Sequence, residues 1–265
     1  MKFFIKKTLT FSFIGLLLFP SFFFMRYYKL DINEIIGNEV YHSISKSTSK
    51  KTGVETLLLG DSIGKQAYNN DTYNNSIYSL ACNQAVSLVG QFLLLQNFFT
   101  SYESPEEVDI VLIYRPSSFR NDLNQPFTFN YFLKPFYNKT NKDYFTRHVS
   151  TQINKIPYFF LAKYSVIKNS NWSPSYNVGR NNPHNFRISK TSVEYIKKIY
   201  FLCKSMNVKS FKIICPFISN KFSINDFKKF KQDIETHNLK KYFKGYFDKI
   251  IFLDKSLFLD GSHLK

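Results

Sequence analysis

Short apolar runs alternate with amphipathic stretches along most of the chain. Five runs of this kind recur: Val54–Leu59, Ile77–Cys82, Asp109–Tyr114, Phe211–Phe217 and Lys249–Leu253. Their length and apolarity suit strands buried on both faces of a sheet. Residues 85–99 and 191–206 instead carry apolar side chains at helical spacing, and Thr191 with Glu194 predicts a capping box. Strands that alternate with helices predict an α/β fold with a mainly parallel sheet.

Residues 116–188 interrupt this alternation. They are rich in Asn, Pro, Phe and Tyr, with the stretch FTFNYFLKPFYNKT at their centre. A loop of that length without structure of its own is uncommon in a compact domain. We therefore expect an insertion that caps the edge of the sheet, with short helices around Tyr158–Val166. Its aromatic side chains either stack on sugar rings or only pack the insertion.

The N-terminal segment has the character of a membrane anchor. Thr8–Met25 is a run of 18 residues without a charge. At about 1.5 Å per helical residue it nearly spans a hydrocarbon core of about 30 Å. No small-residue cleavage site follows it, which favours an uncleaved anchor. Lys2, Lys6 and Lys7 slightly outweigh Arg26 and Lys29, which predicts a cytoplasmic N-terminus and a protein body outside the membrane.

These patterns divide the chain into three parts. Residues 1–30 are the predicted single-pass anchor, and residues 31–52 are the predicted tether because ISKSTSKKT is rich in Ser and Lys. Residues 53–265 form the predicted domain, which is long enough to bury a sizeable core.

Composition excludes several classes of function. The formal net charge of +17 invites a polyanion, but lysine is spread along the whole sequence and no nucleic-acid recognition motif accompanies it. We expect no nucleic-acid partner. The five histidines lack metal-ligand spacing and no C-x-x-C pair occurs, so neither metal nor cofactor is expected. Cys82, Cys203 and Cys215 are predicted to be buried free thiols, with a Cys203–Cys215 disulfide as the alternative.

The stretch LLLGDSIGKQ, residues 57–66, is the first candidate for chemistry. A phosphate loop needs G-x-x-x-x-G-K followed by Ser or Thr, whereas Gly60 to Gly64 is one residue too short and Gln66 follows Lys65. A nucleotide site is thereby excluded. Two interpretations remain open: Ser62 is a nucleophile on a strand-to-helix turn, or the stretch is only a helix N-cap.

The last residues supply the partners that such a nucleophile requires. Asp260 and His263 lie three residues apart after the last predicted strand. A serine hydroxyl becomes a good nucleophile when a base takes its proton, and the imidazole base needs a carboxylate to fix its tautomer. Ligands bind at the carboxyl ends of the strands in an open parallel sheet, which is where both segments are predicted to lie.

The two blocks together resemble the SGNH, or GDSL-type, hydrolase superfamily. Gly60-Asp61-Ser62 matches its first block, and Asp260-Gly-Ser-His263 matches its last block. The resemblance implies a flavodoxin-like three-layer sandwich in which Ser62 is the nucleophile, His263 the base and Asp260 its partner. With the anchor, it is similar to bacterial members that add or remove acyl groups on cell-envelope polysaccharides. It implies a catalytic domain outside the cytoplasmic membrane.

The middle blocks depart from the family pattern. The second block usually offers a glycine N–H to the oxyanion hole, but here the turn is Ala81-Cys82-Asn83-Gln84. Asn83 either stabilises the oxyanion or caps the following helix. Asn121 stands several residues later than the asparagine of the third block. Arg115 is a rival there as a substrate or oxyanion contact, or it forms a salt bridge at the rim of the sheet.

Two hypotheses of different classes follow. The first is a serine esterase or O-acyltransferase that acts on an acylated glycan through an acyl-enzyme. The alternative is a non-catalytic envelope protein that uses the same fold to bind glycan or an assembly partner. The family usually continues into a closing helix, whereas two residues follow His263 here. Either the sequence is truncated or the histidine turn is held by upstream contacts alone.

Overall fold

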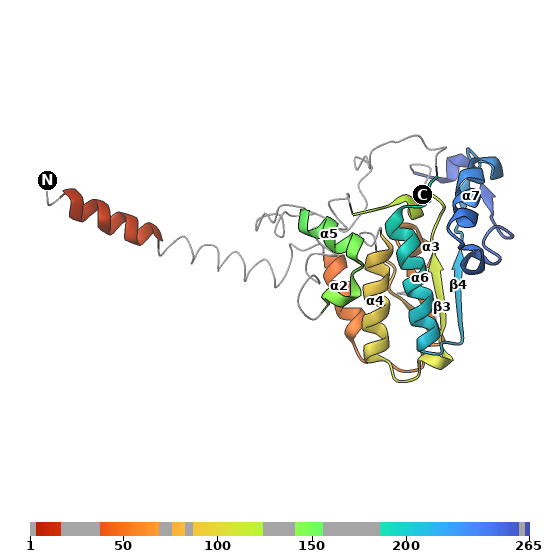
Figure 1. The fold of residues 1–265 in the computed structure, drawn as a ribbon, viewed down its shortest axis with the longest axis horizontal. Coiled ribbons are helices and arrows are strands. Elements are labelled where there is room, and N and C mark those ends of the chain that lie inside the picture. Colours follow the sequence, from red (N-terminus) through yellow and green to blue (C-terminus); the bar gives the residue numbers. More distant parts are fainter. Residues whose placement is uncertain are drawn as a thin grey trace.

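Four parallel strands form the central sheet of the computed structural model (Figure 1). The structure describes residues 4–16, 38–68, 76–82, 87–123, 141–155, 186–259 and 263–265. The strands are β1 (Thr56–Gly60), β2 (Ile77–Ser79), β3 (Asp109–Ile113) and β4 (Ser210–Ile214). Their order is β2-β1-β3-β4: the chain runs outward from β1 to β2 and then crosses back past β1 to β3 and β4, so the strand order reverses between the neighbours β1 and β3. The expected α/β fold with a parallel sheet is confirmed.

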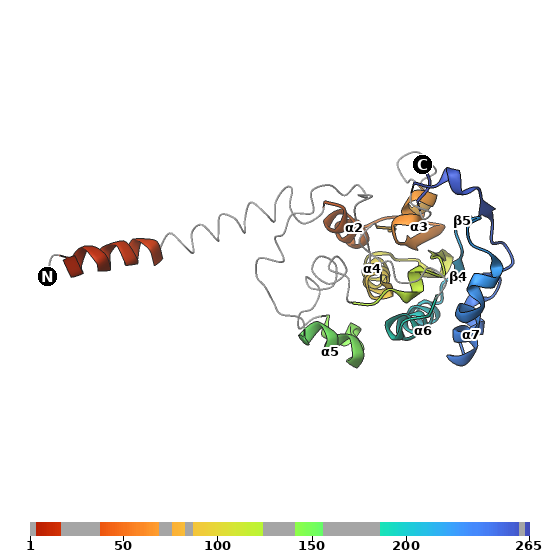
Figure 2. The same ribbon diagram turned by 90° about the horizontal axis from the view of Figure 1, so that it is seen from above.

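The described residues from 38 onward include the helices α2 (Asn38–Thr48), α3 (Ser62–Ala67), α4 (Leu88–Ser101), α5 (Arg147–Lys155), α6 (Lys190–Ser205) and α7 (Lys228–Thr236). Short 3₁₀ turns lie at Pro105–Glu107, Ser118–Arg120, Lys142–Tyr144, Ile224–Phe227, Lys240–Phe243 and Lys255–Leu257. Helices α4 and α6 pack side by side along one face of the sheet, and α3 lies toward the other (Figure 2). This arrangement is consistent with a three-layer sandwich. Right-handed crossovers require it, because β1 to β2 and β2 to β3 run in opposite directions across the sheet.

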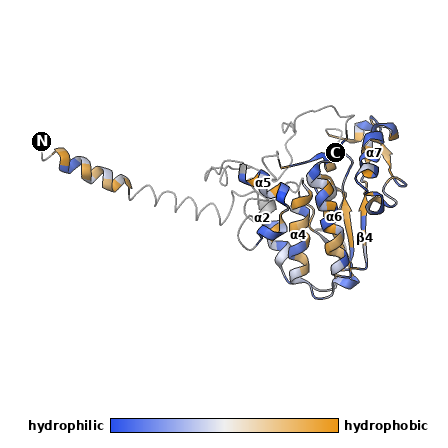
Figure 3. Cartoon of the chain, viewed as in Figure 1, coloured by the Kyte–Doolittle hydropathy of each residue, from blue (hydrophilic) through white to orange (hydrophobic). Residues whose placement is uncertain are grey.

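The core lies between these layers. Leu57, Leu58 and Leu59 are all buried, as the continuous apolar run predicts for a strand covered on both faces. Helix α6 alternates between hydrophobic and hydrophilic residues around its surface (Figure 3). Its apolar side, which includes Ile196 and Ile199, is fully buried.

The predicted strand Lys249–Leu253 does not join the central sheet. Only Phe252–Leu253 is a strand, β6, and it pairs in parallel with β5 (Ile218–Ser219) in a separate two-stranded sheet. The predicted run Phe211–Phe217 is divided as well, because β4 ends at Ile214. Pro216 follows, and a residue without an N–H cannot continue a ladder.

Both helix starts differ from the prediction. Helix α6 is capped by Ser189, whose side chain accepts a hydrogen bond from the Ser192 N–H, so the Thr191–Glu194 capping box is wrong. Both side chains have tertiary partners instead, since Thr191 donates to Asp122 and Glu194 accepts from Thr146.

The N-cap of α4 is Ser87. The predicted capping role of Asn83 is therefore wrong. Asn83 itself lies outside the described residues.

The predicted tether, residues 31–52, is wrong for residues 38–48, because they form α2, which packs against α4. Small side chains allow the two helices to approach closely. Ser47 is fully buried, and its Oγ accepts a hydrogen bond from Asn97 Nδ2 at 3.0 Å. The Ser101 hydroxyl donates to the Ser47 carbonyl at 3.0 Å. A Ser/Lys-rich stretch therefore forms a packed helix here, because Ser47 faces the partner helix α4.

The N-terminal helix covers residues 4–16 and exposes apolar side chains such as Phe4, Leu9 and Phe11. The remainder of the predicted span, residues 17–25, lies outside the described part of the chain. Over the ranges that the structure covers, no helix has both the length and the apolarity to cross a membrane.

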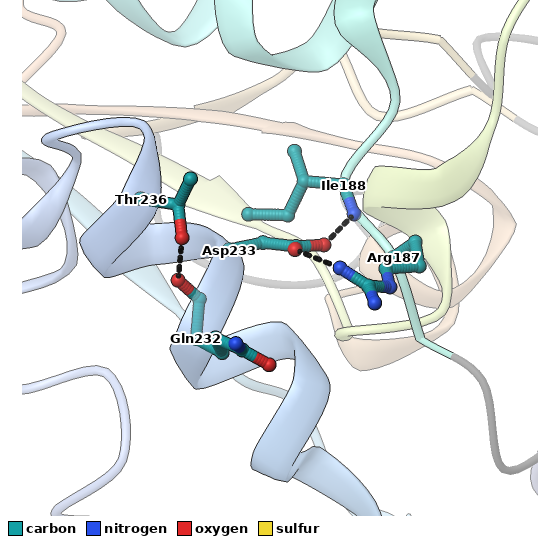
Figure 4. Close-up of polar contacts among 5 residues, drawn as sticks. All are labelled: Arg187, Ile188, Gln232, Asp233 and Thr236. Carbon is teal, nitrogen blue, oxygen red and sulfur yellow. Dashed lines mark hydrogen bonds and ion pairs between the residues drawn. The ribbon is translucent and has the colours of Figure 1, made fainter.

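The insertion contains α5, whose Val149 and Ile153 are buried in the core. The predicted helices around Tyr158–Val166 lie outside the described residues. The chain re-enters the described structure at residue 186, next to α7. There the buried carboxylate of Asp233 accepts hydrogen bonds from Arg187 Nη1 at 2.7 Å and from the Ile188 N–H at 2.9 Å (Figure 4).

Candidate functional site

A sharp turn from β1 into α3 places Ser62 at the carboxyl end of the sheet. Asp61 is the N-cap of α3: its Oδ1 accepts a hydrogen bond from the Ile63 N–H at 3.0 Å, and its side chain is buried. Ser62 is the first residue of the helix and is half-buried. The stretch thus contains a helix N-cap, which is Asp61. The Ser62 hydroxyl takes no part in the cap and is available for another partner.

Two glycines let this turn lie directly against the end of β3. A Cβ on Gly60 would stand 3.0 Å from both the Gly64 Cα and the Ile113 carbonyl oxygen. A Cβ on Gly64 would stand 3.3 Å from the Cβ and the carbonyl oxygen of Ile113. The spacing G-D-S-I-G thus serves close packing of α3 on β3, which is a role distinct from phosphate binding.

The C-terminal segment folds back on itself and carries His263 to the same place. Phe258 and Leu264 form an antiparallel bridge, the Leu259 N–H donates to the His263 carbonyl at 2.7 Å, and the Lys265 N–H donates to the Leu257 carbonyl at 2.9 Å. The His263 side chain is buried. Contacts with upstream residues therefore hold the histidine turn.

Ser62 and His263 meet across the site. Ser62 Oγ lies 2.8 Å from His263 Nε2, although 201 positions separate the two residues in the sequence. This is the distance at which an imidazole nitrogen can accept the proton of an attacking hydroxyl. The third predicted member, Asp260, lies outside the described residues, as does the oxyanion candidate Asn83.

Arg115 lies two residues beyond the end of β3 and is buried, so it is not a solvent-exposed group at the rim of the sheet. Burial raises the pKa of Cys215 to about 11 and that of Tyr246 well above its usual value, and the nearby Arg115 guanidinium lowers both pKa values by a smaller amount. Arg115 is thus a buried cation at the carboxyl end of the strand next to β1.

Asn121 is placed differently. Its N–H donates to the Ser118 carbonyl at 3.1 Å, and its carbonyl accepts from Ser189 Oγ at 2.9 Å. The second of these bonds joins the start of the insertion to the N-terminus of α6, and neither bond leads to Ser62.

Two residues at the site escaped the sequence analysis. The Tyr246 hydroxyl, which is buried, donates to the Tyr114 carbonyl at 2.6 Å and so fixes the end of β3. Gln91 of α4 hydrogen-bonds with both backbone groups of Gly60. Gln91 had a signal in the sequence, since it is the single polar residue in the stretch LVGQFLLL. No comparable signal marks Tyr246 in the sequence, because it is one of many aromatic residues.

In the part of the chain that the structure describes, no three His, Cys, Asp or Glu side chains lie close enough to hold a metal ion. All three cysteines are free thiols, Cys82 and Cys203 buried and Cys215 half-buried. Burial also raises the pKa of Cys203 to about 12.

Comparison of the chain with protein-family models, with curated proteins and with solved structures found no match.

Proposed function

We propose that the protein is an SGNH-type serine esterase or O-acyltransferase in which Ser62 is the nucleophile and His263 the general base. The observation that carries this proposal is the 2.8 Å separation of Ser62 Oγ and His263 Nε2. Two short motifs at opposite ends of the domain each predict one half of a catalytic pair, and their side chains meet in hydrogen-bond contact.

The proposed reaction has two halves. His263 Nε2 takes the Ser62 proton as Oγ attacks the ester carbonyl, and the resulting imidazolium then protonates the departing alcohol. This leaves an acyl group on Ser62. In the second half, water or a sugar hydroxyl gives its proton to His263 and attacks the acyl carbonyl; the bond between the acyl group and Ser62 Oγ then breaks, and Oγ takes the proton back from His263. Water completes hydrolysis, and a sugar hydroxyl completes transfer. The carboxylate of Asp260 is proposed to accept a hydrogen bond from the His263 Nδ1–H.

The topology supports a site at this position. The order β2-β1-β3-β4 corresponds to the first four strands of the flavodoxin-like order. In such sheets ligands bind beyond the carboxyl ends of the strands where the order reverses, which here is between β1 and β3. Ser62 follows β1 and Arg115 follows β3, so we propose Arg115 as a substrate or oxyanion contact.

The proposed substrate is an acylated polysaccharide of the bacterial cell envelope. The proposed location of the domain is outside the cytoplasmic membrane, held there by the N-terminal segment. Support for the anchor comes from the uncharged run Thr8–Met25 and from the exposed apolar side chains of the helix over residues 4–16. The aromatic composition of the insertion is suited to stacking on sugar rings.

The serine–histidine distance argues against the non-catalytic alternative. A fold retained only for binding has no requirement for a histidine in hydrogen-bond reach of a serine at the ligand-binding edge of the sheet. The buried position of His263 strengthens this argument, because a buried imidazole needs a partner and Ser62 provides one.

A fluorophosphonate probe tests the proposal, since it forms a stable bond only with an activated serine. We expect the full chain in detergent micelles to be labelled at Ser62, and Ser62→Ala to abolish labelling. Ser205→Ala is the matched control, because Ser205 is exposed at the end of α6. Absence of labelling in the folded wild-type chain, or labelling that persists in Ser62→Ala, would refute the proposal.

A further inference from the structure

Gln91 places a primary amide in an apolar environment, where its hydrogen bonds connect it to the nucleophile turn. Its side chain is fully buried on α4. Its Oε1 accepts from the Gly60 N–H at 3.0 Å, and its Nε2 donates to the Gly60 carbonyl at 2.8 Å. Burying an amide costs free energy unless both of its ends are satisfied. Gly60 satisfies both.

The register of the sheet explains why Gly60 needs this partner. Alternate residues of β1 bond toward β2: the Leu80 N–H donates to the Leu58 carbonyl at 2.8 Å, and the Cys82 N–H donates to the Gly60 carbonyl at 3.1 Å. The Gly60 N–H points to the same side, beyond Ser79, where β2 ends. Gln91 Oε1 supplies there the acceptor that a peptide group of a longer strand would supply to the Gly60 N–H. Gln91 Nε2 adds a second donor to the Gly60 carbonyl, which also accepts from the Cys82 N–H.

This clamp acts on the residue that precedes Asp61 and Ser62. Gly60 has no side chain to restrict its backbone, so its direction depends on packing and on hydrogen bonds. Gln91 also hydrogen-bonds with the side chain of Tyr114, the residue that directly follows β3. The amide therefore ties the ends of β1 and β3 together at the point where the strand order reverses.

We propose that Gln91 is a positioning residue, which holds the Gly60 backbone so that Ser62 Oγ stays in line with His263 Nε2. The inference rests on the proposed function and adds to it a residue that does not touch the substrate. A side chain with a merely structural role would affect stability alone. A positioning residue also sets the rate at which Ser62 reacts.

The experiment compares three variants of the full chain in detergent micelles. Gln91→Met keeps the length of the side chain and removes both hydrogen bonds. Gln91→Glu keeps the acceptor, and it has a donor only while its carboxyl group is protonated. Gln96→Met is the matched control, because Gln96 lies on the same helix and is half-buried.

We expect Gln91→Met to slow fluorophosphonate labelling about 10- to 100-fold, because small displacements of a reacting group are costly. Turnover of 4-nitrophenyl acetate should fall through kcat more than through KM. Gln91→Glu should lose activity as pH rises and the new carboxylate ceases to donate to the Gly60 carbonyl. Hydrogen exchange of the Gly60 amide should accelerate in Gln91→Met, and Gln96→Met should resemble the wild type.

Faster exchange at Gly60 with an unchanged labelling rate would overturn the positioning role, and so would equal slowing in Gln96→Met. Unchanged exchange at Gly60 would overturn the clamp itself. A wild-type chain that is not labelled would overturn the proposed function and the positioning role with it. Because the exchange experiment needs no activity, it distinguishes a failure of the clamp from a failure of the enzyme assignment.

Discussion

Ser62 Oγ and His263 Nε2 lie 2.8 Å apart at the carboxyl end of the central sheet, and each is held by its own local structure. Ser62 starts a helix that Asp61 caps, and His263 sits in a turn bridged by Phe258 and Leu264. Neither residue depends on the other for its backbone conformation. The pair is therefore set by the fold and is available for chemistry.

Replacing His263, the proposed base, tests the Ser62–His263 pair. We expect His263→Ala to lower ester turnover by about 10² to 10⁴-fold, the usual contribution of a general base. The comparison is His237→Ala, at an exposed position after α7, which should retain wild-type turnover. Turnover is measured with 4-nitrophenyl acetate. A fully active His263→Ala chain would remove the whole triad assignment.

Asp260 is the proposed triad member that rests on the sequence alone. We expect Asp260→Asn to keep the fold and to lower turnover by about 10² to 10⁴-fold, because the imidazole loses the carboxylate that fixes its tautomer. Asp248→Asn, an exposed change nearby in the sequence, serves as the control. Circular dichroism checks the fold. Unchanged turnover in Asp260→Asn would exclude Asp260 from the mechanism.

The two glycines of the turn should respond differently to a methyl group. Gly60→Ala meets backbone atoms at 3.0 Å, so we expect overpacking to destabilise the protein by about 1–3 kcal/mol. Gly64→Ala meets Ile113 at 3.3 Å, and its gain in helix propensity, about 1 kcal/mol, offsets part of the cost. Urea unfolding measures both. A Gly64→Ala chain that is the less stable of the two would contradict this ranking.

Asp233 should matter far more for stability than the arginine it pairs with. Asp233→Ala leaves the buried Ile188 N–H without its acceptor, at a cost of about 1–3 kcal/mol. Arg187 is 55% exposed, so Arg187→Met should cost about 0–1 kcal/mol. Thermal unfolding of both variants tests the difference. Equal losses of stability would mean that the ion pair, rather than the hydrogen bond to the Ile188 N–H, anchors the segment before α6 to α7.

The Cys215 thiol should be unreactive at neutral pH. Burial raises the pKa of Cys215 to about 11, so the thiolate that reagents attack is scarce below that pH. We expect iodoacetamide to modify Cys215 slowly from pH 7 to 9 in the native chain and rapidly once urea unfolds it. Peptide mass spectrometry gives both rates. Esterase activity should survive the treatment, and rapid alkylation with loss of activity would contradict a serine mechanism.

The sequence by itself determined the elements whose signals are local. The apolar run before Gly60, the helical spacing of residues 191–206 and the change of residue type at Gly60-Asp61-Ser62 all depend on near neighbours. They predicted the α/β class, the parallel sheet and the two halves of the site. Local patterns also misled: the serines of residues 44–48 resemble a tether, and Thr191 with Glu194 resembles a capping box.

Only the tertiary structure decided which of these groups meet. The contact of Ser62 with His263 needs the chain to return to β1 after the whole sheet is built, and no local pattern records that return. In the sequence Gln91 is only a polar residue in an apolar helix, and the packing of α4 on β1 shows that its partner is Gly60. In the sequence Gly64 is only a glycine within a helix, and the structure shows that it allows α3 to lie against Ile113. Hydrogen bonds and close packing act over a few ångströms, so their partners are fixed by strand order and crossover direction and not by position along the chain.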